Sequence, residues 1–437
     1  MAFLACSPSR QITTPTTSAQ PKAPIPSPME DTTHVQAPVS VAKTDAFLED
    51  LLKSRPEYFD SILTNRTAWK VQVIYTQIDR QGDNSPLFKT YYFNYDPAEY
   101  IYPASTVKMP IALLALQKLH ELRLPGLDRN STMITEAAYN KQSPVYNDPS
   151  TPDGRPSVAN YVKKIFMVSD NDAFNRLYEF LGQQYINDWL HKMGFGSAEI
   201  LHRLEISMTA DENRHSNPIK FLDPAGKTLY SQPMQFNETI YSKRNDAMGI
   251  GYYRGDSLVN HPMDFSGKNR LSLEDLTGIL KSILFPSAVP EKQRFNITDD
   301  DYQFVRKYMS QLPTESKFPP YSADTASYWP AFCKFLLFGS EKRELPKNIR
   351  IFNKIGDAYG CLTDVAYVVD YDKKIEFMLS ARLYCNVDGI LNDDKYDYDN
   401  IGFPFMKHLG QLLYDYELKR QRTRTPDLGS FKFTYDK

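Results

Sequence analysis

The sequence predicts an α+β domain in which a five-stranded antiparallel sheet is flanked by helices and joined to a helical subdomain. Two observations support this prediction. Two strand-like segments, 69–75 and 89–95, form a hairpin ahead of a long helical middle. Three more strand-like segments, 349–355, 363–370 and 374–383, follow that middle with short turns between them, as in an antiparallel meander. We therefore expect the first and last strands to share one sheet.

The first 41 residues differ in composition from the rest of the chain. The segment 1–6 is apolar and ends in a small residue and Cys6, which resembles the end of a bacterial lipoprotein signal. A plain N-terminus with a chance cysteine is an equal alternative. Residues 7–41 are rich in Pro, Thr and Ser with almost no large apolar side chains, so we expect a disordered tether. A lipid on Cys6 would anchor an exported, periplasmic or membrane-tethered bacterial protein.

Residues 42–420 are expected to form the folded domain, and residues 421–437 a polar tail. Helices are predicted, in chain order, over residues 47–52, 105–121, 157–167, 172–181, 272–283, 299–311 and 404–420. Ser157 and Ser272 are placed to cap two of these helices, and Asp45 to cap the first. Residues 194–270 are rich in Gly, Asn, Asp and Pro and are predicted as long loops.

Composition excludes several classes of function. The net charge is −2 and no basic stripe with interleaved aromatic residues occurs, so nucleic-acid binding is not expected. No apolar run approaches the ~20 residues that span a bilayer. The four cysteines lack C-x-x-C spacing and the seven histidines are scattered, so neither a metal nor a cofactor is expected. Cys361 and Cys385 are predicted to be free, buried thiols. We expect a monomer that acts on a small molecule.

A serine and a lysine three positions apart precede an apolar helix. Ser105 and Lys108 are followed by the run 111–116, whose even hydrophobicity is typical of a buried helix. Positions i and i+3 share one helix face, so we expect the hydroxyl and the amine within hydrogen-bond reach. Serine needs an adjacent base to become a nucleophile, and a partly neutral lysine supplies one. S-x-x-K alone often occurs by chance, so the pair needs further support.

Three more motifs follow in order. Ser169-Asp170-Asn171 lies between two predicted helices, where on its own it is more often a capping turn. Arg203-Leu204-Glu205 comes before the long loops, and Lys354-Ile355-Gly356 opens the meander. Together with Ser105 and Lys108, this series resembles the S-x-x-K, S-D-N and K-T-G motifs of class A β-lactamases and penicillin-binding proteins, with the R-x-E of the class A omega loop.

The resemblance implies four catalytic residues and no cofactor. Ser105 would attack a carbonyl and become the acyl ester, with Lys108 as proton acceptor or relay. Ser169 would pass a proton to the leaving nitrogen. Glu205 would position and activate the water that hydrolyses the acyl-enzyme.

The resemblance also implies residues that bind substrate. Asn171 would hydrogen-bond the substrate amide and Lys108, and Lys354 would attract a substrate carboxylate. Gly356 completes the third motif, and the backbone N–H of Asp357 would form an oxyanion hole with that of Ser105. Asp170 is expected to be a structural brace that accepts backbone hydrogen bonds in its turn.

Several departures from the family pattern affect the choice of substrate. Ile355 stands where the family has Thr or Ser, whose hydroxyl helps bind the β-lactam carboxylate. After Glu205 the usual Asn is missing, and Thr209 is an imperfect candidate for its role. Extra chain follows Glu205 and again occurs near 313–346. We expect a hydrolase of a β-lactam or related cyclic amide. The alternatives are a D,D-peptidase-like enzyme, a hydrolase of another amide or ester, and a non-catalytic binding relative.

Overall fold

A computed structural model describes residues 42–241 and 243–436. The lipoprotein-like segment with Cys6 and the tether lie outside these residues. In the described part, no helix combines the length and the hydrophobicity that crossing a membrane requires.

The predicted five-stranded sheet is confirmed. It comprises β1 (Gln72–Arg80), β2 (Pro86–Phe93), β12 (Ile349–Ala358), β13 (Cys361–Asp370) and β14 (Ile375–Tyr384). The strand order is β12-β13-β14-β1-β2, and every neighbouring pair is antiparallel. Both faces of β13 and β14 are buried, which accounts for their nearly continuous apolar sequence. β12 lies at one edge of the sheet.

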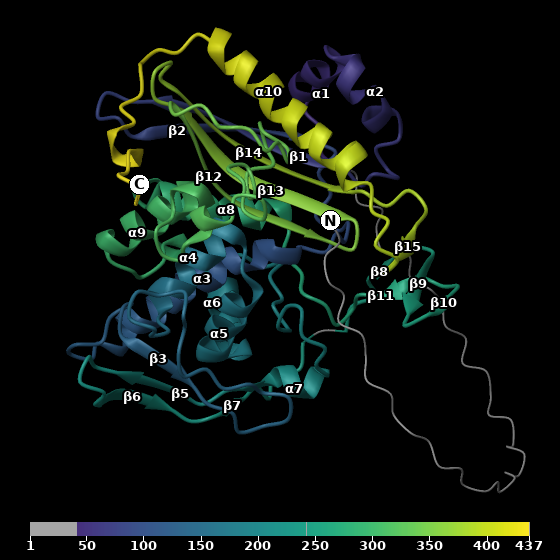
Figure 1. Ribbon diagram of the computed structural model, residues 1–437. Coiled ribbons are helices and arrows are strands. Elements are labelled where there is room, and N and C mark those ends of the chain that lie inside the picture. Colours follow the sequence, from purple (N-terminus) through teal and green to yellow (C-terminus); the bar gives the residue numbers. More distant parts are fainter. Residues whose placement is uncertain (1–41, 242, 437) are drawn as a thin grey trace, which may run out of the picture. The chain divides into compact units, whose positions relative to one another are not determined.

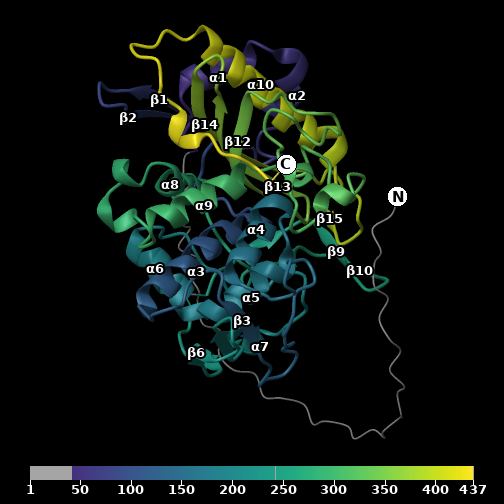
Figure 2. The ribbon, with the colours of Figure 1, turned by 60° about the vertical axis from the view of Figure 1, so that its left-hand side comes forward.

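Helices cover both faces of the sheet (Figure 1). One face packs against α1 (Ala46–Lys53), α2 (Pro56–Thr64) and α10 (Phe403–Lys419). The other packs against α8 (Leu273–Leu284) and α9 (Asp299–Ser310), which separate the sheet from the helical subdomain (Figure 2). Helix α2 was not predicted. Asp45 does occupy the N-cap of α1, but its carboxylate accepts the backbone N–H of Tyr92 in place of a helix N–H.

The helical subdomain contains the 3₁₀ turn η1 (Ala104–Val107) and four helices, which are α3 (Lys108–Leu122), α4 (Val158–Val168), α5 (Asn171–Leu181) and α6 (Gln183–Met193). Ser157 and Ser272 cap α4 and α8 as predicted, each accepting the backbone N–H three residues later. Most of α3 is fully buried, in agreement with its even hydrophobicity. Helix α6 was not predicted.

The region 194–270, predicted as loops, also contains regular elements. They are α7 (Ala210–Arg214), β4 (His215–Ser216), β5 (Ile219–Leu222), β6 (Thr228–Gln232), β7 (Gln235–Phe236), β8 (Ala247–Met248), β9 (Gly251–Arg254), β10 (Ser257–Val259) and β11 (Met263–Asp264). β3 (Thr132–Thr135) joins β5 and β6 in one small sheet, and β15 (Ile390–Leu391) joins β9 and β10 in another. Such strands are too short to show a period in the sequence.

The remaining helical turns are η2 (Pro286–Ala288), η3 (Glu291–Gln293), η4 (Pro313–Glu315), η5 (Tyr321–Ala323), the π-turn η6 (Tyr398–Gly402) and η7 (Gly429–Phe431). The last of these belongs to the segment predicted as a polar tail. Here the structure differs, because Leu428 and Phe431 are buried in the main core and hold the segment against the domain. Cys361 and Cys385 are buried free thiols, which confirms the prediction.

Candidate active site

Ser105 lies in a tight turn that the sheet edge holds in place. Ala104 has φ 46°, a left-handed conformation that is costly for a residue with a side chain, and the hydroxyl of Thr106 donates to the carbonyl of Pro103 (2.6 Å). Gly356 on β12 packs against this turn. A Cβ atom on Gly356 would lie 2.8 Å from the Pro103 carbonyl oxygen and 2.9 Å from the Ser105 nitrogen, so only glycine fits. This contact brings the backbone of Asp357 beside that of Ser105.

Lys108 is fully buried beneath the cleft. Its ammonium donates to the backbone carbonyl of Ser169, to Asn171 Oδ1 (2.5 Å) and to Ser169 Oγ (3.3 Å). The predicted hydrogen bond from Ser105 to Lys108 is not formed among the described residues. The reason is local: the lysine begins α3, while Ser105 belongs to the 3₁₀ turn before it, and the Ser169 turn offers Lys108 three acceptors.

Ser169 connects Lys108 to the second lysine of the site. It has φ 60°, as the left-handed C-cap of α4, and this conformation turns its carbonyl and hydroxyl toward Lys108. Lys354 donates to Ser169 Oγ (2.7 Å) and to the carbonyl of Ile355 (2.8 Å). Asp170 caps α5 by accepting the N–H of Ala173 (2.7 Å), which confirms its expected structural role. The hydroxyl of Ser169 therefore lies between two buried amines.

Burial changes the proton affinity of both lysines. Desolvation lowers the pKa of Lys354 to about 8. Desolvation, followed by the charge of Lys354, holds the pKa of Lys108 well below its usual range. The lowered pKa favours the neutral form of Lys108 more than in a lysine exposed to water, and a neutral amine can accept a proton. The amine is thus suited to act as a base on Ser105 or on Ser169.

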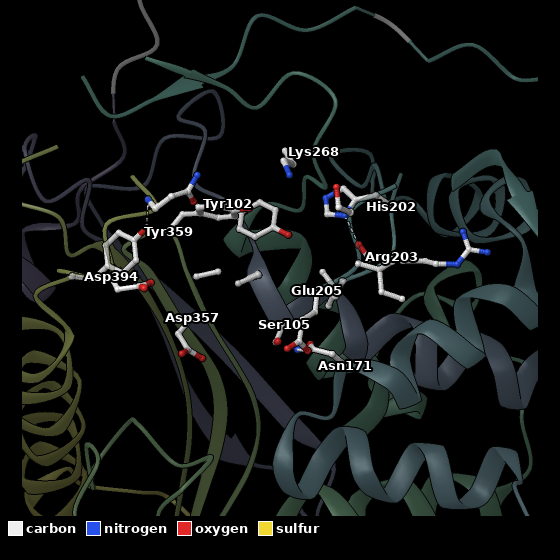
Figure 3. Close-up of a pocket in the computed structure, with 17 residues that line it drawn as sticks. Tyr102, Ser105, Asn171, His202, Arg203, Glu205, Lys268, Asp357, Tyr359 and Asp394 are labelled. Atoms are coloured by element: carbon white, nitrogen blue, oxygen red, sulfur yellow. Dashed lines mark hydrogen bonds between the residues drawn. The ribbon is translucent and has the colours of Figure 1, made fainter. Parts of the chain in front are cut away.

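Glu205 faces the same site from the other side. Its Oε2 accepts a hydrogen bond from Asn171 Nδ2 (2.7 Å), so Asn171 bridges Glu205 and Lys108. Glu205 is exposed to the cleft and has φ 63°, again a strained conformation. Glu205 and Ser105 therefore line one cleft (Figure 3).

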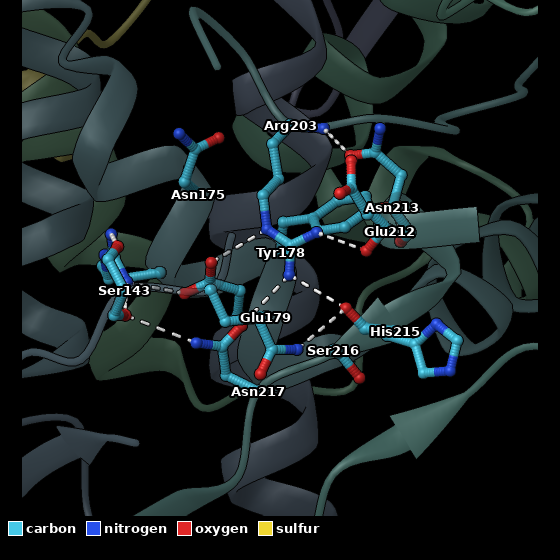
Figure 4. Close-up of polar contacts among 12 residues, drawn as sticks. Ser143, Asn175, Tyr178, Glu179, Arg203, Glu212, Asn213, His215, Ser216 and Asn217 are labelled. Carbon is cyan, nitrogen blue, oxygen red and sulfur yellow. Dashed lines mark hydrogen bonds and ion pairs between the residues drawn. The ribbon is translucent and has the colours of Figure 1, made fainter. Parts of the chain in front are cut away.

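A buried ion pair holds the segment that carries Glu205 (Figure 4). Arg203 Nε donates to Glu179 Oε1 on α5 (2.8 Å), and both side chains are almost fully buried. Asn175 holds the next residue, Leu204, by accepting its N–H (2.9 Å) and donating to its carbonyl (3.0 Å). Neither Glu179 nor Asn175 was predicted from the sequence. Both lie on α5 one and two turns after Asn171, and that helical spacing is the only signal that could have indicated them.

Comparison with known proteins decides the family. The model of the "Beta-lactamase enzyme family" matches residues 59–299, more than half of the chain. The chain belongs to this β-lactamase family. The matched range includes Ser105, Lys108, Ser169 and Glu205 and ends before Lys354. No curated protein matches the sequence at a significant level.

Solved structures of β-lactamases resemble this family member. A β-lactamase from Xanthomonas campestris has 15% sequence identity and a TM-score of 0.45, covering 85% of this chain and 100% of its own. A class A β-lactamase from Clostridium kluyveri has 14% identity and a TM-score of 0.45, covering 82% of this chain and 98% of its own.

The predicted site residues of this β-lactamase-family protein surround one cleft of about 660 Å³ (Figure 3). Ser105, Asn171, Glu205 and Asp357 line the cleft, and Lys108, Ser169 and Lys354 lie beneath it. The wall also contains aromatic, polar and charged side chains, among them Tyr102, His202, Lys268, Tyr359, Asn392, Asp394 and Tyr396. None of these wall residues was predicted from the sequence, because they lie in loops and turns scattered along the chain and belong to no motif.

The structure shows the environment of two residues at which the sequence departs from the family pattern, Ile355 and Thr209. Ile355 is 4% exposed and offers no hydrogen-bond donor to a ligand. The hydroxyl of Thr209 accepts the N–H of Glu212, and the Glu212 carboxylate accepts the N–H of Thr209 in return. Thr209 thus caps α7, and it does not line the cleft. The expectation that it replaces the missing Asn is therefore not supported.

Proposed function

We propose that this protein is a serine hydrolase of the class A β-lactamase type, which opens an amide such as a β-lactam through an acyl-enzyme on Ser105. The observation that carries the proposal is the pair of buried lysines with lowered pKa that meet at the Ser169 hydroxyl, one of which, Lys108, follows Ser105 by three residues. A serine beside a desolvated amine is the arrangement that nucleophilic catalysis needs.

In the first half of the reaction, Ser105 Oγ attacks the carbonyl carbon and forms the ester bond. Its proton passes to the neutral amine of Lys108. The carbon–nitrogen bond of the substrate then breaks, and the leaving nitrogen takes a proton from the hydroxyl of Ser169, which Lys108 reprotonates. The N–H groups of Ser105 and Asp357 stabilise the oxyanion, each such donor contributing about 3 kcal/mol.

In the second half, a water molecule attacks the ester. Glu205 accepts its proton, the ester bond to Ser105 breaks, and the Ser105 oxygen recovers the proton as the carboxylic acid leaves. The exposed position of Glu205, held by Asn171 and by the buried anchor at Arg203, supports this role. A carboxylate that activates water favours hydrolysis over transfer of the acyl group to an amine.

A hydrolase of another amide or ester is the second candidate. Ile355 favours it, because an alkyl side chain replaces a hydroxyl that would bind the carboxylate of a penicillin or cephalosporin. The chemistry at Ser105 would be the same, and only the substrate would differ.

Hydrolysis of a chromogenic cephalosporin, together with labelling by a fluorescent penicillin, tests the proposal. Wild-type protein is expected to turn over the cephalosporin or to keep a covalent label, and Ser105→Ala to do neither. Ser257→Ala, an exposed serine on β10, is the matched control and should behave as wild type. Equal labelling of Ser105→Ala and wild type would refute the proposal.

A further inference from the structure

The Asp357 side chain is an unusual feature of the cleft. Its carboxylate is exposed, lines the same cavity as Ser105 and Glu205, and forms no hydrogen bond or ion pair with any described residue. It lies on β12, two positions after Ile355 and therefore on the same face of the strand. The Ile355 side chain packs into the core and does not reach the cleft, so at this edge of the sheet the Asp357 carboxylate alone faces a bound substrate.

The positive charges near Asp357 are already engaged elsewhere. Lys354 donates to Ser169 and to the carbonyl of Ile355, and Lys108 donates to Ser169 and Asn171. Neither lysine lines the cleft. Both stabilise the Asp357 carboxylate through space, yet desolvation outweighs them and raises its pKa. A cation on a bound ligand would meet Asp357 directly.

The other charged groups of the wall do not compensate for Asp357. Burial lowers the pKa of His202 to about 4, so this ring is neutral at pH 7. The guanidinium of Arg203 points away from the cleft toward Glu179 (Figure 3). Among the described residues, Lys268 is the one cation whose charged group borders the cleft, and its ammonium lies at the rim over the Tyr359 ring, 5.7 Å from the ring centroid (Figure 3).

Aromatic rings line the same wall. Tyr102 and Tyr359 pack edge to face with ring centroids 5.4 Å apart, and Tyr396 also borders the cavity. The faces of such rings attract cations because of their quadrupole. A carboxylate next to tyrosine rings is a combination that suits an ammonium group and repels a carboxylate.

We propose that this cleft selects acyl donors that carry a positively charged group near the scissile bond and discriminates against donors with a carboxylate there. Asp357 is the residue that determines this preference. The inference rests on the proposed function, since the scissile bond is the one that Ser105 attacks. Attraction and repulsion at close range in a protein cleft are each large enough for a tenfold change in affinity.

Three forms of benzylpenicillin that share one β-lactam test the preference. They are the free acid, which is anionic, its methyl ester, which is neutral, and its choline ester, which is permanently cationic. Calorimetric titration of Ser105→Ala measures binding without chemistry. We expect the choline ester to bind at least ~10-fold more tightly than the free acid, with the methyl ester between them.

Asp357→Asn in the Ser105→Ala background should reduce the ratio between the affinities for the choline ester and for the free acid to about twofold. Asp415→Asn, which removes an exposed carboxylate on α10 that does not line the cleft, should leave it unchanged. The inference is overturned if the free acid binds as tightly as the choline ester, if neither ester binds, or if Asp357→Asn leaves the ratio unchanged.

The proposed function is tested separately in the protein with Ser105 intact. There, mass spectrometry detects whether the β-lactam ring adds covalently. Selective binding of the choline ester without any adduct would refute the acyl-enzyme and leave the charge preference standing. An adduct that forms fastest with the free acid would refute the charge preference and leave the acyl-enzyme standing.

Discussion

The floor and the rim of the site are built in different ways. The floor comprises Ser105, Lys108, Ser169, Asn171 and Lys354, and each of these residues lies on or next to a long helix or a strand of the main sheet. Both lysines are buried, and Lys108, Ser169, Asn171 and Lys354 are joined by hydrogen bonds, so their positions depend on the packing of these elements.

The rim comprises Lys268, Asp357, Asn392, Asp394 and Tyr396. Except for Asp357, these residues come from two segments: Lys268 follows β11, and the other three follow β15, which pairs in parallel with β9. Asp357, Asn392 and Asp394 are exposed, while Tyr396 is half-buried and packs against a small hydrophobic cluster. The comparison teaches that the floor sets the chemistry, while the rim can change the substrate at little cost to the fold.

The largest expected effect follows from removing the base of the floor. Lys108→Met should slow acylation of Ser105 by ~10²–10⁴-fold, because no described group replaces the desolvated amine. Lys118→Met is the matched control, since Lys118 lies on the same helix and burial lowers its pKa to about 8, yet it does not line or underlie the cleft. Stopped-flow measurement of acylation separates the two variants. Equal acylation rates for Lys108→Met and Lys118→Met would show that the lowered pKa of Lys108 plays no part in acylation.

The buried ion pair between Arg203 and Glu179 can be tested for its contribution to the stability of the protein. Arg203→Met leaves Glu179 with one of its two arginine partners and should lower the free energy of unfolding by about 3–5 kcal/mol. Arg254→Met, at an exposed position on β9, should change it by less than about 0.5 kcal/mol. Urea denaturation measures both. If Arg203→Met lowers the free energy of unfolding as little as Arg254→Met does, the ion pair does not stabilise the segment that carries Glu205.

The pH dependence of acylation sharpens the account of the two lysines. Because the pKa of Lys354 is lowered to about 8, its positive charge is lost as the pH rises through 8, and acylation should fall there. Lys354→Met removes a charge that lowers the pKa of Lys108. The pKa of Lys108 should then rise, so the increase of the acylation rate with pH on the acidic side of the profile should move to higher pH. The fall of the rate near pH 8 should disappear. If the acidic side of the profile is the same in Lys354→Met and wild type, Lys354 does not lower the pKa of Lys108.

The smallest effect concerns Thr209. Thr209→Ala removes the cap of α7 and should cost about 1 kcal/mol of stability without changing the rate of deacylation. Thermal unfolding and single-turnover hydrolysis give the two quantities. A slower deacylation at full stability would return Thr209 to the role of holding the water.

The sequence was sufficient to predict the main sheet and the floor. Long strands and helices carry a clear period, and Ser105, Ser169 and Lys354 lie in short motifs at the ends of such elements. It did not reveal that Lys108 would hydrogen-bond Ser169 rather than Ser105, because that depends on a 3₁₀ turn and a left-handed residue. The partners Asn175 and Glu179 carry no motif and become evident only when α5 packs beneath Glu205.

The rim could not be predicted for a different reason. Strands of two to five residues, such as β9, are stabilised by pairing with distant segments, and this pairing leaves no recognisable pattern in the local sequence. The segment 421–436 likewise joins the core through Leu428 and Phe431, two apolar residues in a polar stretch. Asp357 was assigned a role through its backbone N–H, while its side chain, which faces the cleft, was overlooked.

Trapping the acyl-enzyme tests the central claim most directly. Glu205→Gln keeps the floor intact and removes the carboxylate that activates water, so deacylation should slow by ~10²–10⁴-fold and the adduct should accumulate. After incubation with the methyl ester of benzylpenicillin, mass spectrometry of the tryptic fragment 90–108 is expected to locate the added mass on Ser105. The account is contradicted if no adduct accumulates, if it lies on another residue, or if Glu205→Gln releases the product as fast as wild type.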